Sequence, residues 1–319
     1  MSVLRVLFLF MTFACARAPT SEPHDADVLP TMPVQEHHEE PTPLEPTALE
    51  PTVPIVPTET PSEPEPTPPV LPEIPPDVPN PDCDWSAVEN FDVPNADWKL
   101  YGNATWDAGG WLELTGNMQT RKGAVFNVAR NLDPGDIVLR FRVSMGQCDV
   151  PDTSCTPQSD GADGLALSVF HVADESELSA LLTVAQPGGG LGYGVGGEYG
   201  NYAGDALHIE FDTWYNIING VELHTDPTRS NHIAITMNGD PGHHVLWRAM
   251  PALDDNRWHD VELQINGAHV TVLFDGQTII DDVVTGLRFK GGFLGFTAST
   301  GFYTNHHRFD DLQFKRPCE

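Results

Sequence analysis

The chain has 319 residues and a formal net charge of −30 at pH 7, with 46 acidic and 16 basic side chains. Because it has no basic stripe and an acidic surface of this size repels phosphate, we expect no nucleic-acid partner. Beyond the N-terminal segment, no apolar run is long enough to span a membrane.

The first 14 residues, 1–14, combine a positive charge with an apolar run, which is the shape of a secretory signal peptide. The pair Ala14 and Cys15 resembles the lipobox of bacterial lipoproteins, in which the cysteine is lipidated and begins the mature chain. Thr12 stands where that pattern prefers leucine, and the alternative is an ordinary signal peptide cut near the same point. We expect an exported protein: an outer-membrane or cell-surface lipoprotein if Cys15 carries a lipid, and a secreted protein otherwise. The lipid anchor would be its contact with a membrane.

Residues 15–82 form a segment rich in proline, threonine and glutamate. Between positions 18 and 82 lie twenty of the twenty-nine prolines and fourteen acids, with no lysine or arginine. Prolines favour extended polyproline II and like charges repel, so this composition cannot build a core. We expect a disordered, semi-rigid stalk ahead of a domain at 83–319.

Without Cys15, four cysteines remain in the exported chain, and four cysteines allow three pairings. We favour a bond between Cys83 and Cys318, which would join the two ends of the domain, and a second bond between Cys148 and Cys155. Zinc binding is disfavoured because the four are not in paired C-x-x-C spacing and the compartment is oxidising.

Apolar residues in the domain recur with period two, which is typical of half-buried strands. The clearest runs cover 111–114, 137–143, 233–237, 261–265 and 270–274. Asn-Gly and Asp-Gly pairs that begin at 238, 266 and 275 mark turns, and the last two predict a hairpin meander. Two packed antiparallel sheets follow from this pattern, with one short helix near 174–182.

Metal-binding side chains gather on one expected strand and in the residues after it. Side chains alternate across a strand, so Glu210 and Asp212 share a face, and Asn216 follows in the next loop. Asp226 and His232 come next. Oxygen suits calcium and imidazole suits a transition ion such as manganese or zinc, so these residues predict two neighbouring cations. The alternative is a polar strand whose acids are merely solvated.

Seven short motifs occur in one order along residues 86–316. They cover 100–105 with 111–115, 162–166 (Ala-Asp-Gly-Leu-Ala), 188–192 (Gly-Gly-Gly-Leu-Gly), 210–216, 226–227, 231–233 and 295–301. In this order they resemble the L-type (legume-type) lectins, and the lipobox resembles a bacterial lipoprotein-like member. The resemblance implies an all-β, concanavalin-like jelly-roll sandwich of antiparallel sheets. It also implies a calcium-dependent module that binds glycans or glycoconjugates without cleaving them.

The resemblance also implies roles for residues around a sugar pocket. The carboxylate of Asp163, after a cis bond from Ala162, would accept hydrogen bonds from sugar hydroxyls. A backbone N–H of the glycine loop would donate, an aromatic ring would pack on the sugar, and a fourth loop would set monosaccharide preference. The implied carbohydrate-binding residues are Asp163, Gly189, Gly190, Trp214, Asn216, Phe302 and Tyr303.

Two cation sites are implied by the same resemblance. Calcium would be held by Asp212, Asn216, Asp226 and the backbone carbonyl of Trp214, and the second ion, Mn²⁺ or another transition ion, by Glu210, Asp212, Asp226 and His232. Asn216 would then turn its carbonyl to calcium and its amide to the sugar.

One departure from the family concerns the fourteen positions that separate Asp212 from Asp226, several more than is usual in legume proteins. The segment 217–225 must bulge outward for Asp226 to reach the ions. If it does not, Glu222 is the nearest replacement.

Two other functions remain open, since this fold also hosts glycoside hydrolases. Hydrolases of the laminarinase type need a second glutamate five residues after the first, and that position is Tyr215, so we expect no enzyme activity. An adhesion or scaffold domain that uses the metals only for stability is the other alternative. The pairs His243-His244 and His306-His307 have no neighbouring residues at a spacing that argues for catalysis, so we expect them at the surface or in packing. The bound sugar and the oligomeric state stay open.

Overall fold

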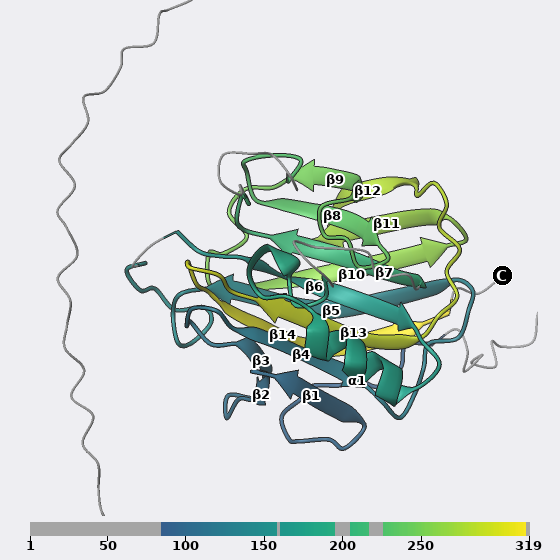
Figure 1. Cartoon of the computed structure of the whole chain (residues 1–319), viewed down its shortest axis with the longest axis horizontal. Coiled ribbons are helices and arrows are strands. Elements are labelled where there is room, and N and C mark those ends of the chain that lie inside the picture. Colours follow the sequence, from purple (N-terminus) through teal and green to yellow (C-terminus); the bar gives the residue numbers. More distant parts are fainter. Residues whose placement is uncertain (1–83, 158–159, 195–204, 217–225, 317–319) are drawn as a thin grey trace, which may run out of the picture. The chain divides into compact units, whose positions relative to one another are not determined.

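The computed structural model describes residues 84–157, 160–194, 205–216 and 226–316 (Figure 1). Two seven-stranded sheets, antiparallel throughout, pack face to face, so the predicted concanavalin-like jelly-roll sandwich is confirmed. The expected signal peptide and stalk, with Cys15, Cys83, Cys318 and Glu222, lie outside the described residues. No helix among the described residues is long and apolar enough to cross a membrane.

The first sheet carries the candidate site, and its strand order is β1-β4-β13-β6-β7-β8-β9. These strands are β1 (Trp98–Gly102), β4 (Lys122–Asn127), β13 (Phe293–Ser299), β6 (Gly164–His171), β7 (Asp205–Asp212), β8 (His232–Met237) and β9 (His244–Ala249). Strands β7, β8 and β9 therefore lie side by side at one edge of the sheet (Figure 1).

The second sheet has the order β12-β11-β10-β5-β14-β3-β2. Its strands are β12 (Gln277–Val283), β11 (His269–Phe274), β10 (Trp258–Asn266), β5 (Ile137–Gly146), β14 (His306–Lys315), β3 (Leu112–Thr115) and β2 (Thr105–Trp106). The five predicted runs fall on β3, β5, β8, β10 and β11, and β10, β11 and β12 form the predicted meander. Period-two patterning was sufficient to place these strands.

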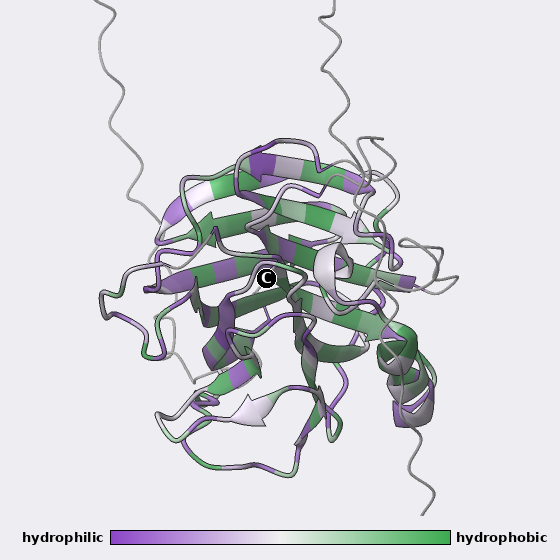
Figure 2. Ribbon diagram, turned by 60° about the vertical axis from the view of Figure 1, so that its left-hand side comes forward, coloured by the Kyte–Doolittle hydropathy of each residue, from purple (hydrophilic) through white to green (hydrophobic). Residues whose placement is uncertain are grey.

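The main core lies between the sheets, where alternate side chains of both face inward. Phe141 on β5 and Phe309 on β14 meet Phe296 on β13, with ring centroids 5.1 Å and 3.6 Å from the latter. Figure 2 shows the corresponding alternation of hydrophobic and hydrophilic residues along the strands. On β7 both faces are buried: Phe211 points into this core, and polar side chains fill the other face.

A second, smaller apolar cluster covers the outer face of the first sheet. Helix α1 (Glu175–Val184) begins at Asp174, whose carboxylate accepts from the Glu177 amide, and it buries Leu178 and Leu182 beside Phe126 and Phe170. This is the helix that the sequence predicted near 174–182. The short 3₁₀ turn η1 (Gly188–Gly190) follows and brings Tyr193 into the same cluster.

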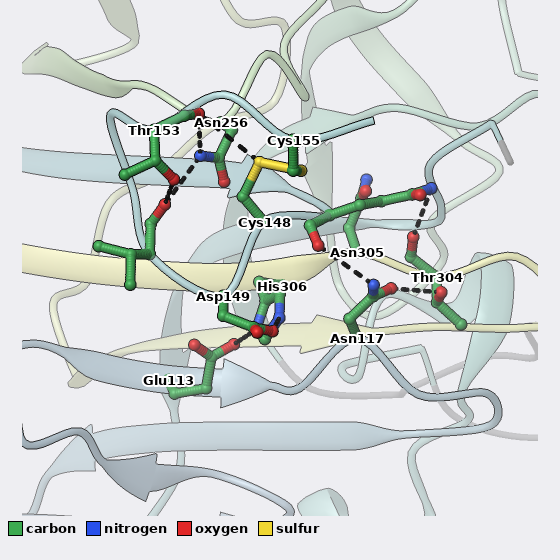
Figure 3. A network of polar contacts seen from close by, with 12 residues as sticks. Glu113, Asn117, Cys148, Asp149, Thr153, Cys155, Asn256, Thr304, Asn305 and His306 are labelled. Carbon is green, nitrogen blue, oxygen red and sulfur yellow. Dashed lines mark hydrogen bonds and ion pairs between the residues drawn. A yellow bond between two sulfur atoms is a disulfide. The ribbon is translucent and has the colours of Figure 1, made fainter. Parts of the chain in front are cut away.

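A disulfide joins Cys148 to Cys155, as predicted, and closes a loop at the end of β5 (Figure 3). Asn256 holds this loop, because its side-chain amide donates to the carbonyl of Thr153 at 3.0 Å. The adjacent Gln147 amide donates to the Thr304 carbonyl at 3.3 Å. The disulfide loop therefore supports the segment that follows β13.

Candidate functional site

The floor of the candidate site is the polar face of β7 and β8. Glu210 and Asp212 share this face, as predicted, and Asp212 is paired in register with His232 across the two strands. All three side chains are buried, with 0%, 3% and 1% of their surface exposed. Charged groups are rarely buried unless they are paired or hold a metal, so the solvated polar strand considered above is wrong.

Asp226 returns to this floor after the segment 217–225, which lies outside the described residues. Its carboxylate accepts a hydrogen bond from the Asn216 amide at 2.6 Å. Donor atoms of Asp212, Asp226 and His232 all lie within 4.8 Å of one another. Asp226 therefore reaches the position that the sequence pattern requires, and no replacement for it is needed.

Asp163 lies above the floor, at the start of β6. The Ala162–Asp163 peptide bond is cis, as predicted. The backbone of Asp163 is fixed on two sides, because its N–H donates to the Ser299 carbonyl at 3.1 Å and its carbonyl accepts from the Thr213 backbone N–H at 2.9 Å. Its side chain accepts from the Asn216 amide at 3.4 Å.

The glycine loop and the loop after β13 close one side of the Asp163 carboxylate. The Ser299 hydroxyl donates to the Gly188 carbonyl at 2.6 Å, so η1, with Gly189 and Gly190, is bound to the end of β13. At Gly301 an added Cβ would lie 3.1 Å from the carboxylate of Asp163. A side chain here would crowd the carboxylate, so glycine leaves it open to a ligand.

Aromatic rings form the rim of the site. Trp214 and Tyr303 have ring centroids 4.3 Å apart at an interplanar angle of 34°, and Phe302 beside them is 76% exposed. Trp214 is only half-buried, so it is not a core residue. Beyond it, a groove of about 630 Å³ runs past Tyr215 and Arg229. The rim therefore offers apolar area next to hydrogen-bonding groups, which is typical of small-ligand sites.

Burial makes the carboxylates of the site costly to ionise. It raises the pKa of Asp163 to about 7, against the hydrogen bonds from Asn216 and Gly301. Burial likewise raises the pKa of Asp226 to about 7. The pKa of Asp212 is raised well above its usual value by burial and then by the charges of Asp226 and Glu210. A bound cation would offset this accumulation of negative charge.

Several buried polar atoms of the site have no hydrogen-bond partner among the described residues. They are one carboxylate oxygen of Asp163, the side-chain oxygen of Asn216 and Nε2 of His232. Buried polar atoms are rarely left unsatisfied, and these are the atom types that ligate calcium and transition ions. The residues therefore fit the two cations that the sequence predicted.

Two residues of the site were missed by the sequence analysis. His244 was expected at the surface or in packing, but its Nε2 lies 3.3 Å from the Glu210 carboxylate, and its side chain is only 5% exposed. Tyr193 packs on the same face of β7, with its ring stacked on His208, and its hydroxyl donates a hydrogen bond to Glu210. No local spacing marks either residue, because both contacts depend on how distant strands and loops pack.

A scan against protein-family models found no match, and a search of curated proteins also found none. Solved structures do match. The lectin from Bauhinia forficata in complex with GalNAc is 18% identical, with a TM-score of 0.56 over 73% of this chain and 97% of that chain. Basic winged bean lectin with Tn-antigen is 19% identical, with a TM-score of 0.54 over 72% and 97%. The Ca²⁺-bound exoplasmic/lumenal domain of VIP36 is 14% identical, with a TM-score of 0.52 over 72% and 89%. At these identities the likeness establishes the L-type lectin fold.

Proposed function

We propose that this chain is a calcium-dependent carbohydrate-binding module that holds glycans without cleaving them. The observation that carries the proposal is the position of Asn216, whose side-chain amide donates to Asp163 and whose backbone N–H donates to Asp226, while its side-chain oxygen has no partner among the described residues. One side chain thus joins a candidate cation site to a candidate sugar site. Calcium would be held by Asp212, Asn216, Asp226 and the Trp214 carbonyl, and would supply the positive charge that keeps these carboxylates ionised.

Each neighbouring group has a role that follows from its chemistry. Ionised Asp163 accepts hydrogen bonds from sugar hydroxyls, and the Asn216 amide donates to one of them. The rings of Trp214 and Tyr303 cover an apolar sugar face. Gly189 and Gly190 offer backbone N–H groups, and Phe302 borders the ligand where preference is set. Calcium here acts by orienting Asn216.

Known ligands of proteins with the same fold support this proposal. The Bauhinia lectin was solved with GalNAc, and the winged bean lectin with Tn-antigen. The VIP36 domain was solved with calcium and, in another crystal, with Ca²⁺ and Man2. We infer glycans or glycoconjugates as partners of this chain on the same basis.

Binding without cleavage is favoured by the surroundings of Glu210. This carboxylate is fully buried, accepts a hydrogen bond from Tyr193 and faces His244, so a glycosidic bond would not reach it. Tyr215, where a hydrolase needs its second acid, turns its ring to Arg229, with the guanidinium carbon 5.2 Å from the ring centroid. A phenol is a much weaker acid than a carboxylic acid and is therefore a poor proton donor to a leaving group.

We propose further that the module is displayed outside the cell. The signal-like residues 1–14, the lipobox cysteine Cys15 and the proline-rich segment 15–82 support a lipid anchor followed by a stalk. A secreted form without the lipid is the alternative. Metabolic labelling with a fatty-acid analogue, compared between the native chain and Cys15→Ser, distinguishes them, since a secreted form incorporates no label.

A glycan array probed with the full chain tests the function directly. With calcium we expect binding to a defined set of glycans, loss of that binding on chelation, and recovery when calcium is restored. A blank array in the presence of calcium would favour the scaffold alternative. Release of reducing sugar from a polysaccharide panel would instead point to a hydrolase.

A further inference from the structure

Three buried side chains from three neighbouring strands face one point beside Asp212 and Asp226. Glu210 lies on β7, His232 on β8 and His244 on β9, and one donor atom of each lies within 4.8 Å of the others. The rings of His232 and His244 are 5.3 Å apart, nearly perpendicular to each other. Two imidazoles and one carboxylate therefore converge.

An irregularity in the strand pairing places His244 in this group. Ile235 on β8 pairs with Leu246 on β9, but the next residue, Thr236, pairs with His244, so Val245 is the extra residue of a bulge. With regular pairing Thr236 would face Val245, and His244 would fall on the opposite face of the sheet. Bulges commonly re-aim a side chain in this way.

The surrounding contacts leave His232 Nε2 available to a metal ion, while the donor atoms of Glu210 and His244 face each other. His232 Nδ1 faces the Ser230 carbonyl at 3.4 Å and can only donate to it, so the lone pair of the neutral ring is on Nε2. That Nε2 has no partner among the described residues, although the ring is 1% exposed. Tyr193 occupies one oxygen of Glu210, and the other oxygen faces His244.

We propose that Glu210, His232 and His244 bind a late transition ion, with Zn²⁺ as the preferred ion. Imidazole nitrogen suits zinc, whereas manganese favours oxygen-rich donor sets, and two histidines with one glutamate is a known zinc-binding combination. At bond lengths of about 2.0–2.2 Å, two ligands of one ion are at most roughly 4.4 Å apart, so a small inward movement brings the three atoms onto one ion.

The inference deepens the proposed function, on which it rests for the neighbouring calcium site, and it changes the expected second cation. His232 belongs both to this group and to the group of Asp212 and Asp226. The proposed zinc ion would therefore lie next to the proposed calcium ion, on the side of the site formed by β8 and β9. The sequence had suggested Mn²⁺ or another transition ion held by one histidine. The second histidine, His244, favours Zn²⁺ among these ions.

Metal-binding measurements on the full chain test the inference. The protein is stripped with chelator, saturated with calcium and titrated with Zn²⁺ or Mn²⁺ by equilibrium dialysis. We expect one tightly bound zinc per chain, held at least about tenfold more tightly than manganese. His244→Gln should weaken zinc binding by about 10- to 100-fold and change manganese binding by less than about threefold.

His243→Gln is the matched control, because His243 is the adjacent histidine and is exposed. It should bind zinc as the native chain does. Histidines in the segment 15–82 are present in every variant, so their contribution cancels. Equal zinc affinity in the two variants, or a native preference for manganese, would overturn the inference.

Two further measurements separate folding and function from metal choice. The thermal midpoint with calcium alone shows whether His244→Gln is folded, and the Co²⁺ absorption bands of the native chain should change when one imidazole is lost. If His244→Gln unfolds, unchanged Co²⁺ bands in a milder His244→Asn variant would contradict the inference. If the native chain binds zinc but binds no glycan in the presence of calcium, the proposed function is refuted and the zinc site is supported.

Discussion

The side-chain amide of Asn216 donates a hydrogen bond to Asp163, 3.4 Å away and 53 positions earlier in the chain. The two residues meet because β6 and β7 are antiparallel neighbours in which Gly164 pairs with Asp212, so the start of one strand lies beside the end of the other. The register of one strand pair thus brings a carboxylate, which can accept hydrogen bonds from sugar hydroxyls, next to an amide, which can donate them. Replacing either residue is therefore a direct test of the site.

Replacing Asp163 with Asn should remove glycan binding and leave the fold intact. A hydrogen bond to a charged group contributes about 1.5–3 kcal/mol, so we expect affinity to fall by roughly 10- to 100-fold. Stability should stay equal or rise, because burial raises the pKa of Asp163 to about 7 and an amide has no charge to desolvate. Glycan affinity and the thermal midpoint, measured in calcium, check both directions. Retained affinity would remove Asp163 from the sugar site.

Replacing Tyr193 with Phe should destabilise the domain, because it removes the hydroxyl that donates a hydrogen bond to Glu210. The hydroxyl is buried and also lies 2.8 Å from the Thr236 hydroxyl, so its loss leaves two polar groups short of a partner. We expect the free energy of unfolding to fall by about 1–3 kcal/mol. Denaturant unfolding of the metal-free chain measures it.

Tyr101→Phe is the control for that change. The Tyr101 hydroxyl is buried and has no partner among the described residues, so its removal should be neutral or slightly stabilising. Equal losses in the two variants would mean that the Tyr193 hydrogen bond contributes nothing specific.

His307 should make the domain less stable as the pH falls below about 6.5. Burial, together with the nearby charges of His306 and Arg308, lowers the pKa of His307 to about 3. The unfolded chain takes up a proton near pH 6.5 and the folded chain does not, so stability present above pH 6.5 is lost progressively down to about pH 3. The slope from this one residue is about 1.4 kcal/mol per pH unit.

His307→Gln removes that proton uptake. It should lower stability at neutral pH, since His307 contacts the Thr115 hydroxyl at 2.6 Å, but its further loss between pH 6.5 and 5 should be smaller by about 2 kcal/mol. Urea unfolding at several pH values gives both slopes. Parallel slopes in the native chain and the variant would show that His307 does not drive acid destabilisation.

Removing the Cys148–Cys155 disulfide should loosen the loop that supports Thr304. With a sequence separation of 7, loop-closure entropy predicts a loss of about 2.5 kcal/mol in the Cys148→Ser, Cys155→Ser chain. Because Gln147 donates to Thr304 next to Tyr303, we also expect altered glycan preference on an array. An unchanged stability and an unchanged preference together would show that the loop is held without the bond.

The sequence by itself determined the strands, the shared face of Glu210 and Asp212 and the Cys148–Cys155 pair. Each of these depends on local features: a period of two along a strand, or a short spacing between two cysteines. The resemblance to L-type lectins added the cis bond before Asp163. Such features are visible in the order of the residues.

Only the tertiary structure decided three further features of the site. The return of Asp226 depends on how the chain closes after a long segment, and the position of His244 depends on a single bulge between β8 and β9. The position of Tyr193 depends on how the residues after η1 pack on the outer face of the first sheet. A one-residue change of register moves a side chain to the other face of a sheet, and register is set by contacts between distant strands. Spacing along the chain could therefore predict a cation site here but not its second histidine.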